Sequence, residues 1–130
     1  MLILLAGCAR PRPEELFAAT VISPVPPSVK NIRVHHIQHA INESTDVFAF
    51  EASPDDLEKI RLSQSFYEVR SQNDEQLAVA KSELKAAEAA GFSPFKPARA
   101  FIFGPEDQPN VFFLFLGDDG RSARFVRWGY

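Results

Sequence analysis

The chain has 130 residues, of which 45% are hydrophobic, 24% charged and 12% aromatic. This length and composition are typical of one globular domain and exclude a disordered or collagen-like chain. The formal net charge of -3 argues against a nucleic-acid partner, and the single cysteine excludes an internal disulfide.

A short apolar run at the amino terminus ends at that cysteine. Its last four residues, Leu5-Ala6-Gly7-Cys8, resemble the lipobox of bacterial lipoproteins. The resemblance implies that residues 1–7 are a signal-peptide remnant and that Cys8 carries palmitate-type acyl chains that attach the protein to a membrane. No charged residue precedes Cys8, whereas a signal peptide has a positive first region, so we expect the true start codon upstream of Met1. The alternative is a buried strand over residues 1–6, with Cys8 as a small core residue.

Residues 8–28 contain five of the ten prolines and predict a stiff, extended tether. No later stretch approaches the roughly 18 apolar residues that a membrane-spanning helix needs, so Cys8 is the expected point of attachment. Ala9 stands where lipoproteins of the inner membrane have aspartate. With alanine at this position, the chain resembles lipoproteins of the outer membrane. The resemblance implies that the protein lies in the cell envelope, at the periplasmic face of the outer membrane in a host that has one.

The first regular elements follow the tether. The β-prone runs Ile32–His36 and Val47–Ala52 flank the polar residues 42–45 and predict a hairpin. Ser53-Pro54-Asp55-Asp56 then provides an N-cap serine, a proline at the first helical position and an acidic third residue, which predicts a helix that begins at Pro54. Residues 65–70 predict a short strand or a loop.

A second helix is predicted between Asp74 and Ala90. Apolar residues recur there at three- and four-residue spacing, at Leu77, Ala80, Leu84, Ala87 and Ala90. Gly91 follows at the position that favours glycine after a helix.

Three strand-like runs complete the chain, Ala100–Phe103, Val111–Leu116 and Ser122–Trp128, and the turn sequence 117–120 joins the last two. Val111–Leu116 is apolar at every position, which predicts a central strand covered on both faces. The element order predicts one α+β domain over residues 29–130, an antiparallel sheet with two helices packed on one face. A small open barrel is the alternative.

Three histidines, His35, His36 and His39, raise the question of a metal site. On a strand, His35 and His39 share a face but lie about 13 Å apart, whereas on a helix they would be one turn apart. The flanking residues favour a strand, and no fourth histidine completes a ligand set. We therefore expect no metal and no cofactor. A periplasmic metal-binding protein or an enzyme that uses these histidines is the alternative function.

The last predicted strand carries Arg121, Arg124, Arg127 and Trp128. Alternation along a strand places Arg121 and Arg127 on one face and the other two on the opposite face. Because arginine and aromatic side chains anchor protein interfaces, these four are the candidate contacts with a protein partner. The alternative is a solvated edge strand that charge protects from aggregation.

No catalytic residue is assigned. The chain lacks the Gly-x-Ser-x-Gly, Gly-x-Gly-x-x-Gly and P-loop patterns. The carboxylates Asp55, Asp56 and Glu58 are explained by the helix amino terminus, which favours negative charge.

Three segments resemble small uncharacterised bacterial lipoproteins: the strand and helix start at residues 47–54, the loop Phe95-Lys96-Pro97 and the closing residues 125–130. Such proteins often have tryptophans in the loop, where this chain has Phe95. The resemblance covers residues 29–130 and brings no activity with it. We therefore expect a non-enzymatic envelope lipoprotein that binds another protein, for example as an inhibitor or an immunity factor.

Overall fold

The computed structural model describes residues 11–70, 75–104 and 109–129. These residues form one antiparallel sheet with the strand order β1-β2-β6-β5-β4-β3. The strands are β1 (Lys30–Ala40), β2 (Glu43–Glu51), β3 (Tyr67–Glu68), β4 (Pro97–Phe103), β5 (Val111–Gly117) and β6 (Ser122–Gly129). The helices are α2 (Pro13–Thr20), α3 (Pro54–Leu62) and α4 (Glu75–Ala89). The predicted α+β domain with an antiparallel sheet is confirmed, and the sheet is open.

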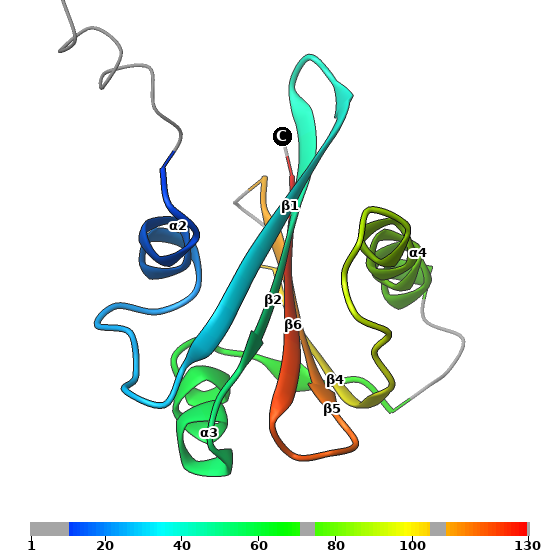
Figure 1. The fold of residues 1–130 in the computed structure, drawn as a ribbon. Helices are drawn as coiled ribbons and strands as arrows, with labels where there is room; N and C mark the ends of the chain where they lie inside the picture. The colour runs from blue at the N-terminus through cyan, green and yellow to red at the C-terminus, as the bar shows by residue number, and fades with distance from the viewer. Residues whose placement is uncertain (1–10, 71–74, 105–108, 130) are drawn as a thin grey trace, which may run out of the picture.

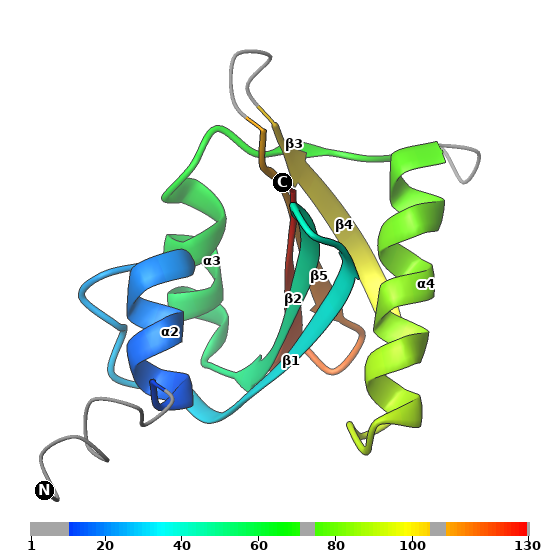
Figure 2. The same cartoon turned by 90° about the horizontal axis from the view of Figure 1, so that it is seen from above.

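The helices pack on both faces of the sheet, which corrects the prediction that two helices share one face. Figures 1 and 2 show α2 and α3 on one side of the sheet and α4 on the other. Ile60 of α3 packs in a cluster with Phe125, and Leu84 of α4 packs in a separate cluster with Val126. Phe125 and Val126 are neighbours on β6 and point to opposite faces. A strand that is apolar on both faces needs a cover on each, so the helices divide between them.

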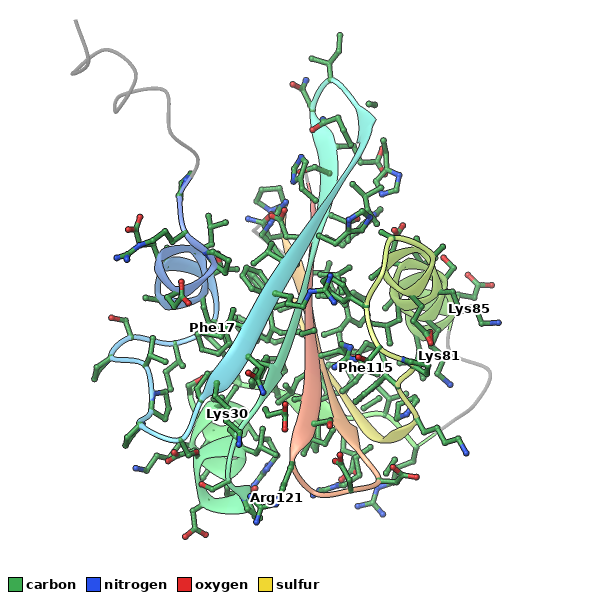
Figure 3. The ribbon with its side chains drawn as sticks, in the orientation of Figure 1. Phe17, Lys30, Lys81, Lys85, Phe115 and Arg121 are labelled. Carbon is green, nitrogen blue, oxygen red and sulfur yellow. The ribbon has the colours of Figure 1, made fainter. Side chains whose placement is uncertain are left out.

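The central position predicted for Val111–Leu116 is confirmed. This segment forms β5, which pairs with β4 on one side and β6 on the other. Leu114 is fully buried toward α2 and α3, and Phe115 is fully buried on the α4 side. Figure 3 shows Phe115 between the sheet and α4. The apolar character of the strand therefore serves two cores.

The amino-terminal segment differs from the predicted tether. Residues 13–20 form α2, with Pro13 in its first turn and two acidic residues beside it, all of which favour a helix start. Phe17 of α2 is fully buried, and its ring lies 6.2 Å from the ring of Phe48 and 4.8 Å from that of Phe50, between centroids. Figure 3 shows Phe17 pointing from α2 toward the sheet. The domain thus includes residues predicted as tether, while Cys8 and the rest of the lipobox lie outside the described residues.

The other predicted helices and strands are present in the structure, but their first and last residues differ from the prediction. The hairpin forms from longer strands than predicted, so its turn narrows to residues 41–42. Only Tyr67–Glu68 of the predicted segment 65–70 is a strand. α4 ends at Ala89, and Gly91 adopts a φ of +114°, the conformation for which glycine was expected there.

Ser53 caps α3 as predicted. Its Oγ accepts a hydrogen bond from the main-chain N–H of Asp56 at 3.2 Å, and its own N–H donates to Ser28 Oγ at 2.8 Å. The Ser28 hydroxyl and N–H donate to the carboxylate of Asp56, which lowers the pKa of Asp56. The cap therefore ties the start of α3 to the segment that precedes β1.

Replacing Ser53 with alanine is expected to lower the free energy of unfolding by about 1 kcal/mol, because a helix donor loses its acceptor. Urea unfolding followed by circular dichroism measures this change. Ser82→Ala on the exposed face of α4 is the control, and its effect is expected to stay within about 0.5 kcal/mol. An unchanged midpoint for Ser53→Ala would mean that the cap contributes nothing.

Asp119 organises the turn between β5 and β6. Its carboxylate accepts hydrogen bonds from the N–H groups of Arg121 at 2.9 Å and Ser122 at 2.8 Å, and from Ser122 Oγ at 2.6 Å. These donors, the Ser122 hydroxyl first, lower the pKa of Asp119 from 3.8 to about 2. The next residue, Gly120, has a φ of +72°, which suits glycine.

The lowered pKa gives a pH-dependent prediction for Asp119→Asn. Because the pKa is lower in the folded than in the unfolded chain, the ionised carboxylate stabilises the fold above the unfolded value of 3.8, and this contribution is lost as the pH falls toward about 2. The variant is therefore expected to unfold at lower urea concentration than the native chain at pH 7, by a margin that shrinks at pH 3. Asp118→Asn, in the same turn, is the control. A margin that stayed constant with pH would contradict the role assigned to the carboxylate.

Candidate functional site

The structure separates the four residues predicted as partner contacts. β6 lies between β2 and β5, so the alternative of a solvated edge strand is wrong. Arg124 and Trp128 lie on the α4 side of β6, as alternation predicts, while Arg127 lies on the opposite face. Arg121 precedes β6 at the end of the sheet where Lys30 also lies (Figure 3). These side chains therefore do not form one surface.

Arg127 belongs to a polar network that joins β1, β2 and β6. Its Nε donates to Asp46 Oδ2 at 2.8 Å, and its Nη2 donates to Ser44 Oγ at 2.9 Å. The other carboxylate oxygen of Asp46 lies 2.6 Å from His36 Nδ1, and this hydrogen bond is the main reason that the pKa of His36 is raised. One carboxylate thus bonds a guanidinium and an imidazole, and the network joins three strands.

The three histidines are not brought together. His36 shares the face of Asp46, whereas His35 and His39 point toward α4. His39 Nε2 lies 3.0 Å from Thr45 Oγ1 and 3.2 Å from Glu83 Oε1. Across the described ranges, no three histidine, cysteine or acidic residues lie close enough to hold a metal ion. The alternative function based on the histidines therefore gains no ligand set from these residues.

A pocket of about 570 Å³ opens on the α4 side of the sheet, at the end away from the β1–β2 turn. Arg33 of β1, Ala49 of β2 and Arg124 of β6 lie in its floor, and residues 92–94, which follow α4, form a wall. Arg124 is only 7% exposed. Sequence reasoning singled out Arg124 but missed Arg33, which lies on a different strand. We call this cavity the arginine pocket.

β1 forms an open edge of the sheet and is the longest described strand. It pairs with β2 alone, and no described residue pairs with the main chain along its outer edge. Its 11 residues include Lys30, Arg33 and the three histidines but no carboxylate. The hairpin formed by β1 and β2 extends past α2 and α4 (Figure 1), and Ile41 in its turn is 95% exposed.

Comparison of the chain with protein-family models, with curated proteins and with solved structures finds no match.

Proposed function

We propose that the protein is a lipoprotein of the bacterial cell envelope, attached through lipid on Cys8, whose folded domain binds another protein without catalysing a reaction. The partner adds an extended segment to the outer edge of β1. An inhibitor or an immunity factor is an example of the role that such binding would serve. In a host with two membranes, the expected location is the periplasmic face of the outer membrane.

The open edge of β1 is the observation that carries the binding proposal. Unpaired N–H and C=O groups along an edge strand are a template for a strand from another chain. β1 carries two permanent positive charges, three histidines and no carboxylate, which favours an acidic partner segment. The exposed Ile41 adds an apolar contact at the end of the same edge. The unpaired edge of β1, its positive charge and the exposed Ile41 together support one elongated binding surface.

The anchoring proposal rests on Leu5-Ala6-Gly7-Cys8. Among the described residues, no helix has the length and hydropathy that a membrane-spanning segment requires. Lipid on the cysteine is the membrane attachment that the sequence pattern supports.

Mass spectrometry and membrane fractionation test the anchor. Expressed in a bacterium from the complete coding sequence, the protein is expected to sediment with membranes and to carry acyl chains on Cys8. The Cys8→Ser variant is expected to move to the soluble fraction. Equal membrane association of the variant and the native protein would refute lipidation. The proposed binding surface on β1 is tested separately, by crosslinking.

Site-specific photo-crosslinking tests the binding surface in intact cells. Ala40 is an exposed position on β1, and a photoreactive side chain placed there is expected to form an adduct with one protein. Peptide mapping of the adduct is expected to locate the crosslink in an acidic, extended segment of that protein. The same side chain at Lys85, on the exposed face of α4, is the control. No adduct at Ala40, or equal adducts at both positions, would overturn the proposal.

A further inference from the structure

Two arginines face each other across an alanine in the floor of the arginine pocket. Arg33 pairs with Ala49 in the β1–β2 register, and Ala49 pairs with Arg124 in the β2–β6 register. The three residues therefore form one row across adjacent strands. Neighbouring strands lie about 4.8 Å apart, so the two arginine backbones are separated by roughly 10 Å, with only a methyl group between them.

A β-bulge in β1 places the side chain of Arg33 on the same face of the sheet as Ala49 and Arg124. Lys30 pairs with Glu51 and Arg33 with Ala49, so β1 has one extra residue in this interval. Asn31 takes up the extra residue with a φ of 57°, and its side chain donates to a Glu51 oxygen at 2.6 Å. Without the bulge, alternation would place Ile32 rather than Arg33 on the pocket face. Bulges re-aim side chains in this way and occur next to functional sites.

Neither guanidinium is neutralised by a direct ion pair. Arg124 donates to the carbonyl oxygens of Ala123 and Ser93, each at 3.0 Å, and Arg33 donates to the carbonyl oxygen of Gly91 at 2.9 Å. Among the described residues, no carboxylate lies within 4.0 Å of either group. The one carboxylate in the lining, Glu51, is bonded to Asn31. The residues that line the pocket thus carry two positive charges and one negative charge, while the carboxylates of Glu88 and Asp119 act on Arg124 from outside the lining.

Aromatic rings hold both guanidinium groups in place. The Arg33 guanidinium lies 4.7 Å from the centre of the Phe92 ring, and that of Arg124 lies 4.5 Å from the centre of the Phe95 ring. Stacking on a ring fixes the plane of a guanidinium, and the N–H groups that do not donate to the main-chain carbonyls point along its edge, where a carboxylate or phosphate binds. At Arg124, which is buried, such a contact is stronger because water competes less for the guanidinium.

We propose that the arginine pocket binds a small ligand through an oxyanion, a carboxylate or a phosphate group, held between Arg33 and Arg124. The pocket volume of about 570 Å³ lies within the range of small-molecule sites, roughly 300–1,000 Å³, so the remainder of the ligand also has space. This site lies on the α4 side of the sheet and needs neither the lipid anchor nor a protein partner.

Nuclear magnetic resonance titration tests the site. The full chain carrying Cys8→Ser, which prevents lipidation, is titrated in separate arms with inorganic phosphate and with succinate, at constant ionic strength. We expect saturable shifts of the Ala49 amide and of the Arg33 and Arg124 side-chain signals with at least one of the two probes. The arm that saturates at lower concentration identifies phosphate or carboxylate as the preferred group.

Arg33→Gln is the decisive variant, because Arg33 is exposed at the sheet edge and its replacement is expected to leave the remaining spectrum unchanged. We expect it to weaken binding at least about tenfold, the usual effect of losing one charged hydrogen-bonding partner. Arg70→Gln removes the same charge from an exposed position outside the pocket and is expected to bind as the parent does. Absence of saturable shifts with both probes, or equal weakening by the two variants, would overturn the proposal.

Discussion

Replacement of Phe17 with alanine is expected to lower the free energy of unfolding by about 3–5 kcal/mol, the usual cost of deleting a fully buried phenylalanine. The side chain is inaccessible to solvent and makes edge-to-face contacts with Phe48 and Phe50 on β2. Its removal leaves a cavity between α2 and the sheet that the surrounding rings fill only in part. Urea unfolding followed by tryptophan fluorescence reports the change, since the chain has a single tryptophan on β6.

Glu14→Ala is the matched control, because Glu14 is exposed on the same helix. Its effect is expected to stay within about 0.5 kcal/mol. If Phe17→Ala were as mild as the control, α2 would not be part of the folded domain. Residues 13–28 would then belong to the tether predicted over residues 8–28.

Replacement of Ala80 with glutamate is expected to cost about 4 kcal/mol at pH 7. Ala80 is 1% exposed in the core between α4 and the sheet. Full burial raises the pKa of a carboxyl group by about 3–5 units, and each unit corresponds to about 1.4 kcal/mol. Because the pKa is higher in the folded than in the unfolded chain, the destabilisation is expected to grow as the pH rises from 5 to 8.

Ala78→Glu provides the comparison within the same helix. Ala78 is exposed, so the same substitution is expected to change stability by no more than about 0.5 kcal/mol at any of these pH values. Similar effects of the two variants, measured by urea unfolding, would contradict the placement of α4 on its own face of the sheet.

Local patterns in the sequence are enough to predict most of the elements. Ser53 and Pro54 define the start of α3 because capping acts within one helical turn, and Gly91 marks the end of α4 for the same reason. The distribution of helices over the two faces depends on contacts between distant segments, which no local pattern contains. The apolar run Val111–Leu116 does predict a cover on each face of the sheet, and that prediction conflicts with placing both helices on one face.

α2 was missed because its proline was interpreted only as a feature of extended chain. Pro13 followed by Glu14 and Glu15 is equally the pattern of a first helical turn. Phe17 in the helix and Val21 at its C-cap, four residues apart, are then the apolar residues that this segment buries. These signals were present in the sequence and favour a helix over a tether.

The arginine pocket could not be predicted from the sequence, for a different reason. Arg33 and Arg124 come from strands far apart in the chain, and only the sheet register places them on either side of Ala49. That register depends on one extra residue at Asn31, which reverses the faces of the residues after it. Alternation counted from Lys30 places Arg33 on the wrong face.

The position of α2 also limits how far the proposed anchor lets the domain travel. Only five residue steps separate Cys8 from Pro13, where the folded domain begins. A fully extended chain covers at most about 3.6 Å per residue, so the segment between Cys8 and Pro13 spans no more than about 18 Å. A domain held so close to the lipid would sample a thin layer next to the bilayer, and its partner would be found by lateral diffusion in that layer. A protein on the far side of the envelope space would stay out of reach.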